Sequence, residues 1–273
     1  MAEIANAVAD KSEKAAAGEP YSLETRELTV RFGGHVAVDK VSCGFHRSTL
    51  TAIVGPNGAG KTTYFNLISG QIRPTAGHVY LEGRDITRMR TSRRAHAGIG
   101  RAFQLTNLFP NLTVEENIRL VLQSRAHLGI DMWRLWDGRK NLIERTGQIL
   151  EMVSLKHRHG KHAAVLSHGD QRKLEVGMLI ALDPEIYMFD EPTAGLSVDE
   201  VPVILDLIRA LKKRSGKTVL LVEHKMDVVR ELADRIIVLH NGAMVAEGDP
   251  ETVIASPVVQ QAYLGLAPSQ EAA

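Results

Sequence analysis

The chain has 273 residues, 44% hydrophobic and 24% charged, with a formal net charge of +1. This composition is typical of a globular protein, and the balanced charge gives no general signal for nucleic-acid binding. Cys43 is the only cysteine, which excludes an internal disulfide and disfavours both an oxidising compartment and a redox role. Because no apolar run approaches the ~18 residues that span a bilayer, we expect a soluble protein that reaches a membrane only through partners.

The two ends of the chain are expected to lie outside the folded domain. Residues 1–20 are rich in alanine and charge and include a glycine and a proline, which favours a flexible leader. Glu3 and Asp10 interrupt any signal-peptide core. We therefore expect one folded domain over residues 21–266, followed by a flexible tail at 267–273.

The first part of this domain is predicted to be rich in strands. Residues 22–32 alternate between apolar and polar side chains, and residues 49–55 form a compact β-run that ends on glycine. A helix pattern follows at 61–70. A short hairpin is predicted at 77–86. Its turn is expected at Glu82, Gly83 and Arg84.

The second part of the domain combines helices with buried strands. Residues 105–183 show helical spacing and almost no β-rich run, which predicts a helical insert. The apolar runs at 186–190 and 218–224 are continuous, as in buried parallel strands, and a helical pattern separates them. A final hairpin is predicted around Asn241 and Gly242. The sequence therefore predicts a parallel sheet flanked by helices.

A cluster of positive charge occurs in the first half of the chain. Because charge runs are usually solvated, we interpret it as a mobile cationic surface. The cluster contains six arginines: Arg84, Arg88, Arg90, Arg93, Arg94 and Arg101.

The sequence GPNGAGKTT fits the phosphate-loop pattern, with a predicted strand before it and a predicted helix after it. Its glycines allow backbone N–H groups to converge on phosphate oxygens at a helix N-terminus. Lys61 would add a positive charge for the β- and γ-phosphates, and the Thr62 hydroxyl could bind Mg²⁺. A nucleoside triphosphate is the expected ligand, against the alternative of an ordinary glycine turn. The candidate binding residues are Gly55, Pro56, Asn57, Gly58, Ala59, Gly60, Lys61, Thr62 and Thr63.

Polar residues at the ends of the later strands suit the same ligand. Asp190 follows an apolar strand and could hold Mg²⁺, and Glu191 could polarise the attacking water. The alternative is that this acidic pair caps a helix. His224 is predicted to end the next strand, at the same sheet edge, and could contact the γ-phosphate or the water; alone, it would be an ordinary strand-end histidine. Gln104 could reach Mg²⁺ or water from the junction with the helical insert.

The motifs disfavour a GTPase as an alternative. The sequence HKMD at 224–227 is similar to the guanine-reading element of GTPases. Its asparagine is missing, however, and Asp190 is followed by EPTAG where a GTPase would show D-x-x-G.

The sequence VLSHGDQRKLEVG at 165–177 begins as a helix N-terminus that would suit an anion. Together with the motifs above it resembles the ATP-binding cassette family, the ATPase subunits of ABC transporters, over about residues 21–265. This resemblance implies a P-loop NTPase with a RecA-like core, an antiparallel β-subdomain and a helical subdomain at about 105–183. The ordered motifs are a Walker A loop at 55–62, a Q-loop at Gln104, the signature LSHGD at 166–170, Walker B at 186–190, Glu191 and the switch histidine His224.

The resemblance also implies where the anion comes from. In the family, the signature serine and glycine, here Ser167 and Gly169, bind the γ-phosphate of ATP held by the Walker A loop of the opposite subunit. Two cassettes would therefore face head to tail, close on binding ATP and Mg²⁺, and separate after hydrolysis. The adenine-stacking aromatic of the family corresponds to Phe32, although a core phenylalanine is an alternative.

Two motifs depart from the family pattern. The usual signature LSGGQ reads LSHGD, with His168 and Asp170 as replacements. An acid beside a triphosphate is unfavourable unless its side chain points away, which puts the hydrolysis rate in question. The loop that commonly reads SALD has Ser197 in place of its aspartate.

Several further stretches match within the family: RFGGHVAVDKVS at 31–42, GIGRAFQ at 98–104 before LFPNLTVEENI at 108–118, TAGLS at 193–197, LVEHKMDVV at 221–229 and SPVVQQAYLG at 256–265. On these stretches the chain resembles the larger ATPase subunit of importers for branched-chain and related hydrophobic amino acids. Importers of urea, short amides or aromatic acids, an exporter cassette, and a cytosolic ABC ATPase that moves nothing are alternatives. The likeness implies a second ATPase subunit in a hetero- or homodimer, two membrane permeases, and an extracytoplasmic solute-binding protein, at the inner face of the cell membrane and without nucleic acid. Residues 104–135 would receive a permease helix, to which Trp133 and Trp136 could contribute unless they pack within the insert.

Overall fold

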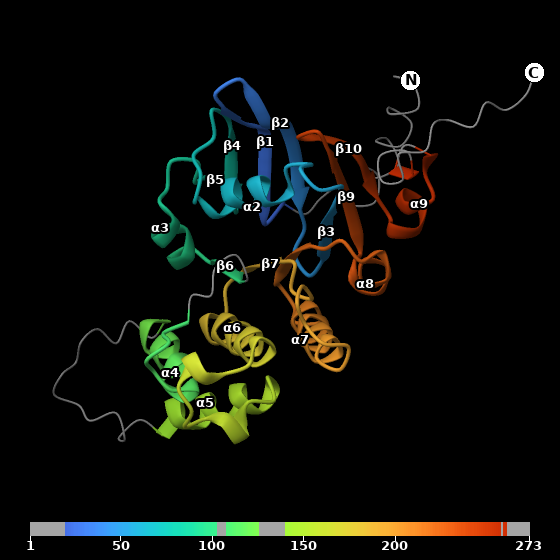
Figure 1. Cartoon of the computed structure of the whole chain (residues 1–273). Coiled ribbons are helices and arrows are strands. Elements are labelled where there is room, and N and C mark those ends of the chain that lie inside the picture. Colours follow the sequence, from blue (N-terminus) through green and yellow to red (C-terminus); the bar gives the residue numbers. More distant parts are fainter. Residues whose placement is uncertain (1–19, 103–107, 126–139, 258, 261–273) are drawn as a thin grey trace, which may run out of the picture.

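The computed structural model describes residues 20–102, 108–125, 140–257 and 259–260. The leader up to residue 19, Gln104, the tryptophans Trp133 and Trp136, and the tail at 267–273 lie outside the described residues. Figure 1 shows two sheets in the upper part of the molecule and a group of helices below them.

The larger sheet has the strand order β10-β9-β3-β8-β7-β6 and is parallel except for β10. Every residue of β3, β7 and β8 is buried, which explains why these strands read as continuous apolar runs. The strands are β3 (Leu50–Val54), β6 (Ile99–Ala102), β7 (Ile186–Asp190), β8 (Thr218–Val222), β9 (Arg235–His240) and β10 (Ala243–Gly248).

The smaller sheet is antiparallel, with the order β2-β1-β4-β5. One apolar cluster joins this sheet to α2 (Lys61–Ser69) and to one face of the larger sheet, with Val38, Phe65 and Met188 among its members. The helix α2 is thereby fixed between the two sheets. The strands are β1 (Leu23–Phe32), β2 (His35–Phe45), β4 (Ala76–Leu81) and β5 (Arg84–Asp85).

The helices α4, α5 and α6 pack together, and α6 connects them to the opposite face of the larger sheet through its contacts with β6. Ile118, Ile149 and Leu174, one from each of these helices, share an apolar cluster with Tyr187 of β7. These elements are α4 (Val114–Arg125), α5 (Lys140–Met152) and α6 (His168–Leu182), with short 3-10 turns at Lys156–Arg158 and Ala163–Val165. The remaining helices are α3 (Thr91–His96), α7 (Val201–Lys212), α8 (Met226–Leu232) and α9 (Pro250–Ile254). The expected fold class, a parallel core with an antiparallel sheet and a helical region, is confirmed.

Two local predictions need correction, and two strands were missed. The turn of the first hairpin contains only Glu82 and Gly83, since both have positive φ and Arg84 already pairs with Leu81 in the ladder. The strand β8 ends at Val222, so His224 lies two residues beyond it. The strands β2 and β6 were not predicted.

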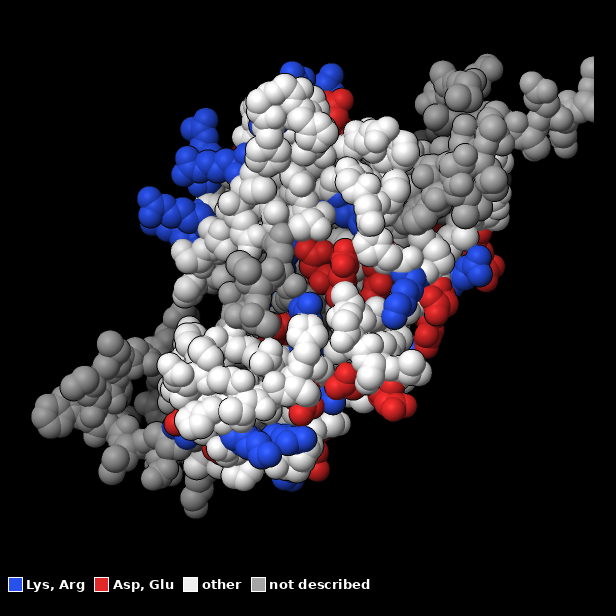
Figure 2. Space-filling view, viewed as in Figure 1, with Lys and Arg blue, Asp and Glu red and all other residues white. Residues whose placement is uncertain are grey.

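The arginine cluster is not one cationic surface. Arg94 is fully buried and the side chain of Arg101 is 7% exposed, so the solvated interpretation is wrong for both. The other four arginines of the cluster are exposed. Figure 2 shows Lys and Arg gathered along the edge beside β5 and α3, and acidic side chains gathered in the middle of the same face.

Candidate nucleotide-binding site

The loop between β3 and α2 has the backbone that a phosphate cradle needs. Gly58 and Gly60 have φ angles of 81° and 97°, a region that glycine enters without steric cost. At Gly60, a Cβ atom would also collide with the carbonyl oxygen of Ala37. Because Gly60 provides no side-chain cap for α2, the first-turn N–H groups of that helix are left for an anion.

The ammonium group of Lys61 lies within this loop. Its Nζ donates to the carbonyl oxygens of Gly55 and Pro56, at 2.7 and 3.0 Å, and the residue is 6% exposed. Burial lowers the pKa of Lys61, while the carboxylates of Glu191 and Asp190 act in the opposite direction. The loop, the lysine and the two acids therefore share one electrostatic environment.

Asp190 ends β7 and is 6% exposed. Its Oδ2 accepts a hydrogen bond from Nη2 of Arg101 at 2.6 Å, whereas its buried Oδ1 has no partner within the described part of the chain. Burial raises the pKa of Asp190, and the hydrogen bond and charge of Arg101 oppose this effect. An unpartnered oxygen on a buried carboxylate is the group that a cation would satisfy.

Glu191 and His224 face one another across neighbouring parallel strands. Their register places Asp190 beside Val222, and Nε2 of His224 lies 2.7 Å from Oε1 of Glu191. Glu191 has a φ of 52°, a left-handed conformation that is uncommon for a residue with a side chain and tends to occur at functional sites. Both side chains remain partly exposed, so a water molecule could reach them.

Glu223 is a residue of the site that sequence reasoning missed. Its carboxylate is 2% exposed and accepts hydrogen bonds from Oγ1 and the backbone N–H of Thr193, at 2.5 and 3.3 Å. It also accepts from the backbone N–H of His224 at 2.9 Å. This carboxylate ties the loop after β7 to the loop after β8. The signal available in the sequence was an acidic residue at the end of the apolar run 218–222, directly before His224.

Ser167 and Gly169 lie at the N-terminus of α6. The Ser167 hydroxyl caps this helix by accepting from the backbone N–H of Asp170 at 3.2 Å. The carboxylate of Glu200 packs against Gly169, where a Cβ atom would collide with it. Figure 1 shows α6 grouped with α4 and α5, away from α2. One chain therefore does not bring Ser167 and Gly169 to its own phosphate loop.

The acidic side chain of Asp170 is neutralised within the chain. Its Oδ1 lies 3.2 Å from Nζ of Lys173, and its Oδ2 lies 3.5 Å from Nε of Arg158. The carboxylate of Asp170 thus forms ion pairs with two cations of the same helical region and points to them.

The profile of the ABC transporter family matches residues 38–194. The chain is 36% identical over 248 residues to the high-affinity branched-chain amino acid transport ATP-binding protein LivG of Salmonella typhimurium, covering 89% of this chain and 97% of that protein. The chain belongs to the ABC transporter family. It is also 37% identical over 250 residues to the corresponding protein BraF of Pseudomonas aeruginosa, with the same coverage of 89% and 97%.

Solved structures of ABC cassettes have the same fold. One is the ADP conformation of an ATP-binding cassette of an ABC transporter, with a TM-score of 0.76, 30% identity, and coverage of 91% of this chain and 100% of that chain. Another is a dimeric post-hydrolysis cassette bound to ADP and Pi, with a TM-score of 0.72, 27% identity, and coverage of 84% and 98%. This protein is an ABC-type ATPase cassette.

The start of α7 and the exposure of Phe32 decide between two pairs of alternative roles for the site residues. No helix begins at Asp190 or Glu191, because α7 starts at Val201, so the helix-cap interpretation is wrong. Phe32 is 50% exposed at the end of β1, so it is not a core phenylalanine. Gln104 lies outside the described residues.

The residues of the cassette fit a magnesium ion that arrives with its nucleotide. Among the described residues, no group of three or more His, Cys, Asp or Glu side chains could hold a metal by itself. Mg²⁺ commonly needs only one or two protein oxygens together with phosphates and water. The unpartnered Oδ1 of Asp190 and the hydroxyl of Thr62, the second residue of α2, are suitable ligands.

Proposed function

We propose that this chain is the ATP-hydrolysing subunit of an importer for branched-chain or other hydrophobic amino acids. The observation that supports the proposal best is the grouping of Lys61, Asp190, Glu191 and His224 around one phosphate loop. LivG and BraF, to which the chain is similar over almost their whole length, are named for branched-chain amino acid transport.

In the proposed reaction, each side chain has a role that suits its surroundings. The loop residues 55–63 and Lys61 hold the phosphates, and Mg²⁺ bound by Thr62 and Asp190 would neutralise developing charge on them. Glu191 accepts a hydrogen bond from the attacking water, while His224 orients Glu191 and contacts the γ-phosphate. Gln104 is proposed to sense the phosphate and Mg²⁺, and Phe32 to stack on adenine from its exposed position.

We propose that the site is completed by a second cassette, whose Ser167 and Gly169 bind the γ-phosphate. Two exposed aliphatic residues support such an interface: Val165, just before the signature, is 71% exposed, and Val198, just after Ser197, is 88% exposed. A second cassette that covered both side chains would remove their apolar surface from water. The capped N-terminus of α6 begins two residues after Val165, at Ser167, and could receive the phosphate.

This arrangement predicts dimerisation driven by nucleotide. The hydrolysis-impaired variant Glu191→Gln is expected to double in mass with Mg²⁺ and ATP, alone or with its cognate second cassette, as measured by light scattering after size exclusion. Adding Ser167→Arg should abolish the doubling because it places charge and bulk at the phosphate contact. Ser92→Arg, on the distant helix α3, is the matched control. A monomeric Glu191→Gln protein under both conditions would refute the composite site.

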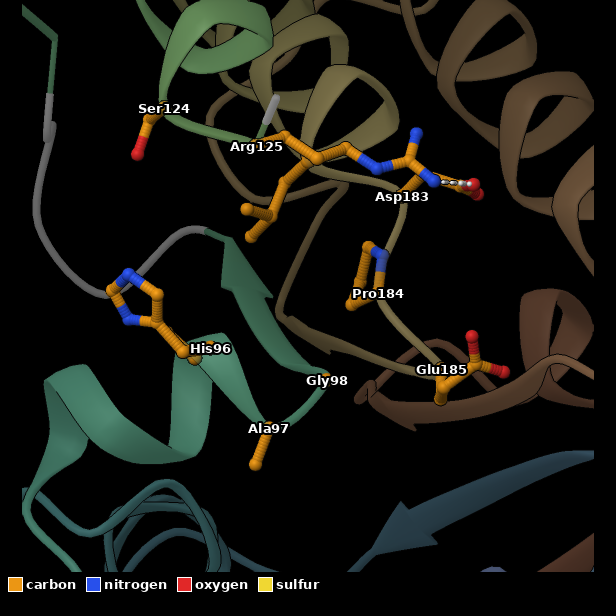
Figure 3. A pocket seen from close by; sticks show the side chains of 10 residues that line it. His96, Ala97, Gly98, Ser124, Arg125, Asp183, Pro184 and Glu185 are labelled. Carbon is orange, nitrogen blue, oxygen red and sulfur yellow. Dashed lines mark hydrogen bonds and ion pairs between the residues drawn. The ribbon is translucent and has the colours of Figure 1, made fainter. Parts of the chain in front are cut away.

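We further propose that a cytoplasmic helix of a permease docks beside α3 and α4. A pocket of about 360 Å³ lies where the α3–β6 turn, the end of α4 and the segment between α6 and β7 meet. Figure 3 shows Ser124 and Arg125 facing His96 and Ala97 across it, with the Arg125–Asp183 ion pair along one side. Arg125 directly precedes residues 126–139, part of the surface expected to receive the permease.

None of the helices in the described ranges is long and apolar enough to cross a membrane. We propose that this docking holds the chain at the inner face of the membrane. Uptake of labelled leucine, urea and an aromatic acid in a strain lacking the gene tests the solute class. Loss of leucine uptake alone, restored by the wild-type gene and not by Glu191→Gln, is expected; unchanged leucine uptake would contradict the proposal.

A further inference from the structure

The side chain of Arg101, on β6, connects β7 to the phosphate-binding helix α2. From β6, its Nη2 donates to Oδ2 of Asp190 at 2.6 Å. Its Nη1 donates to the Asn66 side-chain oxygen at 2.7 Å. Further acceptors, Ser69 and Gln71, both lie 3.2 Å away, and the guanidinium group lies over the Phe65 ring, 5.4 Å from its centroid. One buried cation therefore joins β7 to the C-terminal half of α2.

The two carboxylate oxygens of Asp190 have different surroundings. Oδ2 is bound to Arg101, while Oδ1 is buried without a partner in the described part of the chain. Both side chains are at least nine-tenths buried, at 7% and 6% exposure. A guanidinium group is planar and forms directional hydrogen bonds, so it restricts rotation of the carboxylate far more than a bulk counterion would.

The other contacts of Arg101 attach its guanidinium group to the helix α2. Asn66 and Phe65 belong to α2, the helix whose first residues are Lys61 and Thr62. Because β6 and β7 are adjacent parallel strands with Arg101 beside Met188, the guanidinium reaches Asp190 diagonally across the strand pair. Oδ1 of Asp190 is therefore held in a fixed position relative to α2, the helix that carries the phosphate-binding residues.

We propose that Arg101 is a positioning residue for the Walker B carboxylate, holding Oδ2 of Asp190 so that Oδ1 is presented to the Mg²⁺ of bound nucleotide. This inference rests on the proposed use of ATP and Mg²⁺. It makes Arg101 a determinant of magnesium dependence rather than of nucleotide affinity as such. Second-layer groups that orient a metal ligand commonly contribute about 10- to 100-fold to metal affinity.

The test compares the affinity for a fluorescent ATP analogue with excess Mg²⁺ and with EDTA, by equilibrium titration. In the wild type, Mg²⁺ should strengthen binding. Arg101→Met should reduce that enhancement about tenfold and leave the affinity in EDTA within about twofold, since no phosphate contact is removed. Arg101→Lys, which keeps the charge but loses the planar geometry, should recover part of the enhancement.

Each other outcome is decisive. An unchanged Mg²⁺ enhancement in Arg101→Met overturns the positioning role, as does an equal loss of affinity with and without Mg²⁺, which would indicate a structural role only. If Arg101→Met does not fold, Asn66→Ala removes the second anchor of the guanidinium and must lower the enhancement in the same direction, or the proposal is wrong. Failure of the wild type to bind the analogue would instead refute the proposed ATP-dependent function.

Discussion

Replacing Glu191 by glutamine is expected to lower ATP turnover at least about 100-fold while leaving the affinity for ATP within about twofold. Glutamine has almost the same shape, so it can adopt the same backbone conformation and remain near His224. It cannot accept a proton from water at neutral pH. The loss should therefore appear in kcat, because the phosphate contacts through Lys61 and the loop are unchanged.

Phosphate release measured at saturating ATP, together with a binding titration, checks this prediction. Glu185→Gln is a matched control, because Glu185 precedes the opposite end of the same strand and pairs with Lys217 at the surface. That control should retain wild-type turnover. Normal hydrolysis by Glu191→Gln would remove Glu191 from its assigned role.

Much of the site could be predicted because it depends on local patterns. The phosphate loop requires particular glycines between a strand and a helix, and this requirement is visible within nine residues, 55–63. The proximity of Asp190 and His224 could be predicted from strand type, since adjacent parallel strands end at the same edge. The predicted end of the strand before His224 was wrong by two residues, and the contact between His224 and Glu191 was found only in the structure.

Other features depend on partners that no local pattern identifies. Arg101 was grouped with exposed arginines because composition alone cannot distinguish a guanidinium bound to a buried acid from a solvated one. The partner of Arg101, Asp190, is 89 residues away, and Glu223 and Thr193 are separated by 30 residues. Such long-range pairs are determined by how the strands are ordered in the sheet.

The signature region, residues 166–170, could be predicted only in part. Its helix start was predicted from Ser167 and is confirmed as a cap. The concern about the charge of Asp170 is answered by its pairing with Lys173 and Arg158, which a sequence pattern does not show. The contact of Ser167 with nucleotide remains a proposal, since it requires a second chain.

Replacing Arg94 by methionine is expected to lower the stability of the protein substantially. Arg94 is 1% exposed, and burial lowers its pKa to about 10. Its guanidinium donates to the carbonyl oxygens of Leu67 and Ile68 at the end of α2, at 2.8 and 2.6 Å. It also donates to the carbonyl oxygens of Thr87 and Met89, at 2.8 and 3.1 Å. Arg94 thus serves as a cap for the phosphate-binding helix.

Methionine can fill much of the volume of Arg94 but donates no hydrogen bond, so buried carbonyl oxygens would be left without their partner. We expect the free energy of unfolding to fall by about 3 kcal/mol, measured by urea denaturation at neutral pH. Arg93→Met, one residue earlier in α3 and exposed, should change it by less than about 0.5 kcal/mol. Equal effects of the two substitutions would show that the four carbonyl contacts of Arg94 do not stabilise α2.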